Sequence, residues 1–394
     1  MPKMMLLVVL ACVAVLVGIT ALAIPRWTRS EGAVRSASPS PIPSTSTPTV
    51  SAPEIVHSGL QALLNDGGPD DTGPGYYESS SPALVAAAAG TDNYRFYRLG
   101  ELLVHDGHAN AIINLSREMN GSWYAWSERR APSSEPDAFI LAWRQIVTTM
   151  RSVPGENFKF LWTLYPSQAT AAECWPGSAY VDYVGSDVLD WYGGPHGSYP
   201  RTASGALDWA LHWQQYLTAS PGGLDWIARF SALTGKPIII PEWGLDFHPF
   251  GGQDDTYFLT RMSAWLKAHH AIGLYWVGGH VTPSGWPGGP LLADAGASAQ
   301  DNTPGVVNGL GTLLGGHLQY AGVYLNDQEA LSDSAARPVL APWQNARYQL
   351  VLSVDINPNP PVTKSYSGPP EPGTRAYQLS DYPNAVTALK QGLG

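Results

Sequence analysis

The sequence has very few cysteines and few charged side chains. Cys12 and Cys174 are the only two cysteines among 394 residues, so no disulfide framework can hold a folded domain together. Charged residues make up 14% of the chain, and the formal net charge is −10. This acidic balance excludes nucleic acid as a partner, because phosphate backbones are bound by a basic protein face.

The short motifs of metal, phosphate and serine chemistry are also missing. The chain has no HExxH or CxxC motif and no glycine-rich phosphate loop. The GxSxG elbow of serine hydrolases is absent too. We therefore expect no metal and no other cofactor. We also expect a monomer.

Aromatic residues, in contrast, are abundant, with 15 Trp and 19 Tyr. Most of them are expected to fill a large core. A smaller number placed at strand ends could stack on the flat faces of sugar rings. Composition alone leaves both interpretations open.

The N-terminal region predicts export. Residues 1–24 contain a long uncharged run, which suits either a membrane anchor or a cleaved signal peptide. Residues 25–56 include a Ser/Thr/Pro tract that cannot bury enough side chains to order itself. We expect an extended linker there, followed by one catalytic domain at residues 57–394. That domain would be extracellular, either secreted or tethered, and would meet the membrane only through the N-terminal segment.

From about residue 82 onward, apolar strands alternate with helical patterns. The predicted strands include Ala111–Leu115, Phe158–Leu164, Tyr180–Val188, Pro237–Ile240 and Ile272–Val277. Such alternation predicts parallel strands joined by helical crossovers, and near-continuous apolar strands predict burial on both faces. We expect an α/β fold, a (β/α)8 TIM barrel, with its active site at the C-terminal ends of the strands.

Two carboxylates follow predicted strands directly. Glu118 comes after Ala111–Leu115 and is followed by Trp123 and Trp126, while Glu242 comes after Pro237–Ile240 and precedes Trp243. A retaining glycosidase needs one carboxylic acid and one carboxylate from separate strand ends facing one cleft. The pair therefore suggests sugar cleavage.

These segments resemble glycoside hydrolase family 26, the β-mannanase-type retaining barrels. Arg117–Trp126 is similar to the family's acid/base motif, and Lys236–Gly244 is similar to its nucleophile motif. Val181–Asp190 and Ile272–Gly279 are similar to its sixth and eighth strands. The resemblance implies that Glu118 is the acid/base and Glu242 the nucleophile.

Further residues near these motifs are expected to contact substrate, and Trp276 is the expected floor of the sugar site. The full set is Arg117, Asn120, Trp123, Trp126, Asp187, Tyr192, Trp243 and Trp276. The chain departs from the family at two positions, residues 117 and 189. A guanidinium at residue 117 would favour ionised Glu118 unless its side chain points elsewhere. At the position where the family often has a tyrosine that contacts the nucleophile, this chain has Leu189, and Tyr192 is the nearest candidate replacement.

The order of the strands predicts a circular permutation. If Ala111–Leu115 is strand four, three βα units are missing ahead of it, and the tail offers Pro304–Asn308, Leu318–Leu325 and Tyr348–Ile356 in their place. The chain order of strands would then be 4-5-6-7-8-1-2-3. The alternative is an ordinary barrel followed by a small C-terminal β domain.

The sequence thus predicts a retaining endo-type β-glycoside hydrolase that acts on a polysaccharide such as β-mannan. The alternative function is a non-catalytic polysaccharide-binding barrel at the cell surface. A carboxyl separation of about 5 Å between Glu118 and Glu242 would favour the enzyme, whereas one well above roughly 10 Å would favour the binding protein.

Overall fold

The structure is a computed structural model of the chain. It describes residues 52–65, 82–121, 124–128, 131, 134–166, 171–190, 199–245, 251–275, 304–305, 307–308, 312, 318–325, 333–356 and 383–393. The predicted leader at residues 1–24 and most of the predicted linker lie outside these residues. In the part that is described, no helix combines the length and the apolar character needed to cross a membrane.

All the strands pair in parallel, as the alternating pattern predicts. They form two sheets, with the orders β3-β2-β1-β8-β7 and β4-β5-β6. The strands are β1 (Ile112–Leu115), β2 (Lys159–Leu164), β3 (Tyr183–Ser186), β4 (Val188–Asp190), β5 (Ile239–Leu245), β6 (Ile272–Tyr275), β7 (Tyr320–Leu325) and β8 (Gln349–Val354).

The two sheets are joined where β3 runs into β4. Asp187 is the one residue between these strands, and the neighbouring Val184 forms an isolated parallel bridge to Ile238, just ahead of β5. At Gly185 an added Cβ would lie 1.9 Å from the carbonyl oxygen of Ile239, so only glycine permits this close approach of the two backbones. The predicted single strand Tyr180–Val188 is therefore two short strands that pass from one sheet to the other.

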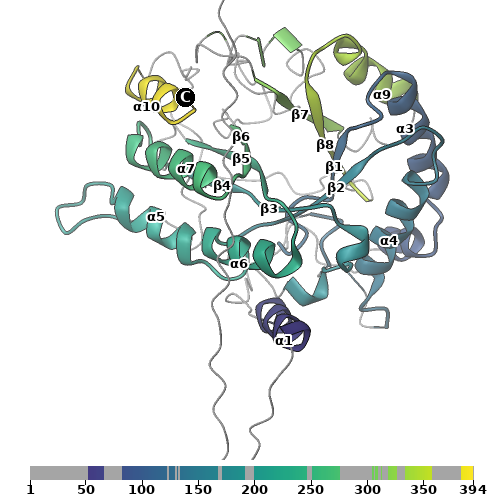
Figure 1. The fold of residues 1–394 in the computed structure, drawn as a ribbon, viewed down its shortest axis with the longest axis horizontal. Helices are drawn as coiled ribbons and strands as arrows, with labels where there is room; N and C mark the ends of the chain where they lie inside the picture. The colour runs from purple at the N-terminus through teal and green to yellow at the C-terminus, as the bar shows by residue number, and fades with distance from the viewer. Residues whose placement is uncertain are drawn as a thin grey trace, which may run out of the picture. The chain divides into compact units, whose positions relative to one another are not determined.

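Helices connect the strands and lie outside them in Figure 1. They are α1 (Ala52–Leu64), α2 (Pro82–Ala88), α3 (Asn93–His105), α4 (Ala138–Met150), α5 (Trp209–Thr218), α6 (Leu224–Thr234), α7 (Thr256–Ala268), α9 (Asp333–Leu340) and α10 (Pro383–Leu393). Local sequence explains several ends. Asp208 and Asp255 cap the N-termini of α5 and α7 by accepting backbone N–H groups, and Gly235 ends α6 in a left-handed conformation.

The alternation of side chains along the strands creates two buried apolar sets. The large set lies between strands and helices and includes Ile113 and Leu115 of β1. The small set lies on the opposite face of the strands. It consists of Ile112, Leu161, Ile239, Leu274 and Val351, with Tyr183, Ile272 and Tyr320 packed against them. Every strand except β4 contributes to this small set.

Helix α1 begins at Ala52, ahead of the predicted domain boundary at residue 57, which stays a prediction. Two other expectations from the sequence are wrong. The predicted strand Pro304–Asn308 is wrong, because Pro304, Gly305, Val307 and Asn308 are helical. The alternative of a separate C-terminal β domain is also wrong, because β8 pairs with β1 and β7 along its length.

Candidate active site

The segment after β1 has an unusual backbone conformation, and it brings the adjacent side chains of Arg117 and Glu118 to one site. Ser116 and Glu118 both have positive φ values, 54° and 52°, which are uncommon for residues other than glycine. The Glu118 N–H donates to the Thr163 carbonyl oxygen over 3.1 Å, and the Ser116 hydroxyl accepts from the Ile356 N–H over 2.8 Å. These contacts to β2 and to the end of β8 hold the segment in its unusual conformation.

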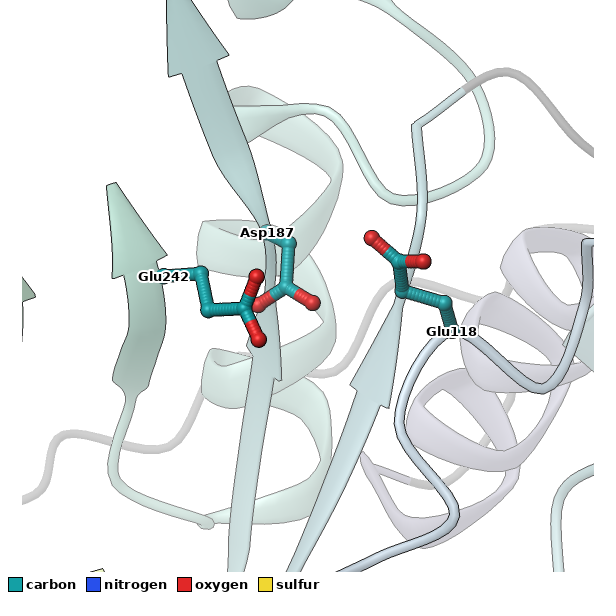
Figure 2. Close-up of side chains that lie close together, drawn as sticks. All are labelled: Glu118, Asp187 and Glu242. Carbon is teal, nitrogen blue, oxygen red and sulfur yellow. The ribbon is translucent and has the colours of Figure 1, made fainter. Parts of the chain in front are cut away.

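Glu118 meets two further carboxyl groups. Glu242 lies within β5, which continues to Leu245 rather than ending at Ile240 as predicted, and Asp187 stands between β3 and β4. One carboxylate oxygen from each of Glu118, Asp187 and Glu242 lies within 4.8 Å of the others. Figure 2 shows the three carboxyl groups converging, with Asp187 between the other two in this view. Glu118 is 7% exposed, Glu242 8% and Asp187 0%.

Asp187 is the most deeply placed of the three acids. No donor among the described residues serves either of its carboxylate oxygens. Burial raises the pKa of Asp187 well above its ordinary value, the charges of Glu242 and Glu118 and a contact with the Glu118 carboxyl raise it further, and Arg117 opposes the shift. Asp187 therefore holds a proton more readily than an exposed aspartate, and it is too buried to present its carboxyl to bulk solvent.

Arg117 points toward Glu242 rather than Glu118. Its Nε lies 3.3 Å from Oε1 of Glu242, and its terminal NH2 group donates to the Tyr124 hydroxyl over 3.0 Å. Burial alone would lower the pKa of Arg117, but Tyr124, Glu242, Tyr324 and Asp355 raise it well above its usual value. The guanidinium is therefore a permanent positive charge beside the second carboxylate, which answers the concern that it would act on Glu118.

Sequence reasoning missed Tyr324, which lies on β7. Its hydroxyl donates to Oε1 of Glu242 over 2.6 Å. The tyrosine that contacts Glu242 among the described residues thus comes from the C-terminal part of the chain, whereas Tyr192, the predicted replacement, lies outside the described residues. Alternation along β7 could have indicated Tyr324, since Tyr320, Gly322 and Tyr324 share one face of the strand.

Sequence reasoning also missed Asp355. It follows β8, is 6% exposed, and its charge acts on both Arg117 and Tyr124. Arg95 of α3 fixes this strand end by donating to the Asp355 and Ile356 carbonyl oxygens over 3.3 and 2.6 Å. Asp355 therefore adds another acidic side chain at the same end of the strands.

Asn120 is fully buried and holds the segment after β1 in place. Its Nδ2 donates to the Tyr165 carbonyl oxygen over 2.9 Å, and its Oδ1 accepts from the Tyr165 N–H over 2.8 Å. These two bonds tie the Glu118 segment to the end of β2. The observed contacts make Asn120 a positioning residue, and its predicted contact with substrate stays a prediction.

The predicted tryptophan platforms are not found where they can be examined. Trp126 is 1% exposed, stacks on Tyr124 with 4.1 Å between ring centroids, and donates to the Arg117 carbonyl oxygen over 2.9 Å. Trp243 is fully buried in the large core, since it follows Glu242 on the opposite face of β5. Both therefore pack, which corrects their assignment as substrate contacts. Trp123 and Trp276 lie outside the described residues.

Three acids this close together are a candidate site for a divalent cation. Carboxylate oxygens are the ligands that Mg²⁺ and Ca²⁺ prefer. The Arg117 guanidinium also lies beside Glu242, so one of the three carboxyl groups already has a cationic partner. The arrangement therefore suits acid–base and nucleophilic chemistry by the carboxyl groups themselves.

One segment of the site, which contains Glu118 and Asp187, matches a known family. Residues 104–199 match the family model described as glycosyl hydrolase family 26. The resemblance to glycoside hydrolase family 26 is confirmed. The matched residues make up about a quarter of the chain and include Glu118 and Asp187. No curated protein matches the chain significantly.

Several solved family 26 structures are similar to parts of the chain. A β-mannanase from Bacteroides ovatus is 16% identical, with 56% of this chain and 63% of that chain covered and a TM-score of 0.37. A mannanase from Bacillus subtilis is 15% identical over 56% and 64%, with a TM-score of 0.33. An endo-β-1,4-mannanase from Bacillus sp. JAMB-750 is 20% identical over 42% and 41%, with a TM-score of 0.28. The matches thus span less than two thirds of each of these structures.

Proposed function

We propose that the protein is a retaining β-glycoside hydrolase, with Glu118 as acid/base and Glu242 as nucleophile. The observation that carries this proposal is the approach of the two carboxyl groups, whose oxygens lie within 4.8 Å of one another. Retaining glycosidases place their two carboxyl groups roughly 5–5.5 Å apart, whereas inverting enzymes separate them by about 6.5–9.5 Å to admit a water. A binding protein has no need for acids at this spacing.

The reaction would proceed through two displacements. First, a Glu242 carboxylate oxygen forms a bond to the anomeric carbon while the bond from that carbon to the glycosidic oxygen breaks. The departing oxygen takes the proton of Glu118. In the second step Glu118, now a carboxylate, takes a proton from water, whose oxygen bonds to the anomeric carbon as the ester to Glu242 breaks. The protonation states of both residues are thereby restored.

The proposed framework is a closed, circularly permuted (β/α)8 barrel. Two observations support it. Side chains from β1, β2, β3, β5, β6, β7 and β8 share one small apolar cluster, as the inward-facing residues of a barrel do. In addition, β7 and β8, which come last in the chain, stand before β1 in the sheet. That order fits strands two, three and four of the family. Because Pro304, Gly305, Val307 and Asn308 are helical, strand one has no assignment among the described residues.

The proposed substrate is a polysaccharide with β-linked backbone sugars, β-mannan first among them, cleaved within the chain. The support is the family 26 match, together with the mannanases among the similar structures. Residues 1–24 would direct export, and residues 25–56 would separate the catalytic domain from the membrane or the cleavage site. No metal or other cofactor takes part in the proposed reaction, and the enzyme would act as a monomer.

The test is a screen of the whole exported chain against galactomannan, mixed-linkage β-glucan and xylan, with analysis of the products. We expect oligosaccharides from at least one polymer and none from Glu242→Ala. Turnover should fall by about 10⁵-fold or more, because the glycosyl-enzyme ester can no longer form. The circular dichroism spectrum and melting temperature of this variant should show an intact fold. Hydrolysis retained by Glu242→Ala would contradict the assignment, and tight polymer binding without hydrolysis by the wild type would favour the binding protein.

A further inference from the structure

Adjacent residues in an extended strand point to opposite faces, yet Arg117 and Glu118 both reach the acid cluster. The positive φ values of Ser116 and Glu118, on either side of Arg117, account for this. Such backbone conformations are costly for residues with a Cβ and persist where surrounding contacts enforce them. The segment is therefore built to deliver a cation and an acid to the same place.

The Arg117 side chain is held by two tyrosines and one carboxylate. Its Cζ lies 5.1 Å from the ring centroid of Tyr124 and 5.1 Å from that of Tyr324, within the range of cation–π attraction. Tyr124 is fixed in turn by its stack on Trp126. The Nε of Arg117 and the Tyr324 hydroxyl approach the same oxygen, Oε1 of Glu242, at 3.3 and 2.6 Å. One oxygen of the proposed nucleophile is thus held from β7 and from the segment after β1.

The groups that face Glu242 have opposing effects on its charge. Asp187 and Glu118 are acids within 4.8 Å and favour the neutral form of Glu242. Arg117 and the Tyr324 hydroxyl favour the carboxylate, and Tyr124 and Asp355 act on Arg117 itself. Arg117 is the one cation at Glu242 among these groups. Without it, three acids would compete for protons in a space that is nearly closed to solvent.

We propose that Arg117 is a positioning residue that keeps Glu242 ionised in the free enzyme, with Tyr324 fixing the Glu242 oxygen. This inference rests on the proposed function. The first displacement needs Glu242 as the carboxylate, and the positive charge of Arg117 beside its Oε1 favours that form before the glycosyl ester is made.

The test compares Arg117→Met, Arg117→Lys and Tyr324→Phe with the wild type on the polymer that the screen identifies. In Arg117→Met we expect kcat to fall by about 10²-fold with little change in KM. The acid limb of its kcat/KM profile should move up by about 1–3 pH units, because an opposite charge beside Glu242 is lost. Arg117→Lys keeps a charge but loses the planar donor fork, so its acid limb should stay nearer the wild type. Tyr324→Phe should lower kcat with a smaller displacement of the limb.

Arg98→Met is the matched control, since Arg98 pairs with Glu101 on the outer helix α3 and both side chains are well exposed. It should leave kcat, KM and the pH profile unchanged. A wild-type pH profile in Arg117→Met, or the same displacement in Arg117→Lys as in Arg117→Met, would overturn the inference. If Glu242→Ala is inactive while Arg117→Met behaves as wild type, only this inference fails; if Glu242→Ala retains turnover, the proposed function fails.

A second measurement does not depend on turnover. The side-chain carboxyl carbons of ¹³C-labelled glutamate can be titrated by NMR in the wild type, Arg117→Met and Arg98→Met, with the Glu242 signal assigned from Glu242→Gln. We expect the Glu242 signal to titrate at higher pH in Arg117→Met than in the other two proteins. An unchanged titration would show that Arg117 does not control the charge of Glu242.

Discussion

Two clusters of buried carboxyl groups lie at the C-terminal ends of neighbouring strands. In one cluster each acid has a hydrogen-bonding or ionic partner, whereas in the other the acids face one another. The catalytic cluster comprises Glu118, Asp187 and Glu242. The Asp190 cluster begins three residues after Asp187 and comprises Asp190, Tyr199, His212 and Asp255, of which all but Tyr199 are essentially inaccessible to solvent. Comparing the two clusters separates acids that build the fold from acids that are arranged for chemistry.

In the Asp190 cluster each acid has a dedicated partner. The Tyr199 hydroxyl lies 2.7 Å from Asp190 and 3.1 Å from Asp255, His212 Nδ1 lies 3.0 Å from Asp190, and Asp255 accepts the Phe258 N–H that begins α7. Burial and the charge of Asp190 raise the pKa of Asp255 to about 7. The Tyr199 hydroxyl has one proton and cannot donate it to two carboxylates at once. A proton on Asp255 supplies the second donor that this pair of acids needs.

The catalytic cluster lacks this internal balance. Its three acids face one another, and neither oxygen of Asp187 has a donor among the described residues. Neighbouring acids raise the pKa of Asp187, and Arg117 offsets them only in part. The repulsion lowers stability, whereas the Asp190 cluster is expected to add to it. Retained strain of this kind is typical of sites that trade stability for activity.

The largest expected effect is the loss of polysaccharide turnover when Glu118 is replaced by Gln. Turnover of the polysaccharide should fall by about 10²–10⁴-fold, because the departing oxygen loses its proton donor. An aryl glycoside with a 4-nitrophenol leaving group needs little protonation, so its first step should be far less affected. Parallel assays of both substrates check this. An equal loss on both would contradict the acid role of Glu118.

Replacing Asp190 by Asn should damage folding and not chemistry. His212 and Tyr199 would lose a buried carboxylate partner, and the free energy of unfolding should fall by about 3 kcal/mol. Urea denaturation measures this, and kcat at a temperature where the variant stays folded should remain close to that of the wild type. Unchanged stability with a large loss of kcat would move Asp190 into the active site.

Asp255 should make stability depend on pH. Its pKa is 3.8 when unfolded and about 7 in the fold, so between these values the folded protein holds a proton that the unfolded chain has released. The free energy of unfolding therefore falls as pH rises through this window and stays lower above it. Between pH 4 and pH 8 the free energy of unfolding should fall by about 4 kcal/mol less in Asp255→Asn than in the wild type. Parallel denaturation curves at several pH values test this, and identical pH dependence would contradict it.

The smallest expected effect is an increase in the free energy of unfolding, opposite in sign to the effect of Asp190→Asn. Asp187→Asn keeps the size of the side chain but removes one of three competing acids, so the free energy of unfolding should rise by about 1 kcal/mol at pH 7. Activity should fall in the same variant, since proton distribution in the site changes. Thermal denaturation beside Asp190→Asn provides the comparison. Destabilisation by Asp187→Asn would show that the catalytic cluster is satisfied in the fold after all.

Local pattern was sufficient to find Glu118 and Glu242, whereas Asp187 came from the family resemblance. Glu118 follows a buried apolar strand and Glu242 lies within one, and parallel strands bring such positions to one edge. The same reasoning failed for Trp243, because Glu242 and Trp243 were both assigned to the site although adjacent residues of a strand face opposite sides. Period-two alternation, applied strictly to β5, would have placed Trp243 in the core.

The partners of these acids depend on long-range contacts that no local pattern contains. Tyr324 of β7 and Glu242 of β5 belong to different sheets, and they meet although 82 residues separate them in the sequence. The direction of Arg117 depends on two left-handed residues, Ser116 and Glu118, neither of which is glycine. The Asp190 cluster likewise joins residues from β4, α5 and the start of α7.

The most direct test of the central claim is the stereochemistry of azide rescue, measured with 4-nitrophenyl β-mannobioside or the aryl β-glycoside of whichever sugar the screen identifies. In Glu242→Ala, azide must attack the anomeric carbon directly from the face of the missing nucleophile, so one inversion should give the α-glycosyl azide. In Glu118→Ala, the ester on Glu242 still forms and azide displaces it, so two inversions should give the β-glycosyl azide. Proton NMR of the two products distinguishes these outcomes. The account predicts opposite anomers from the two variants, and the same anomer from both would contradict it.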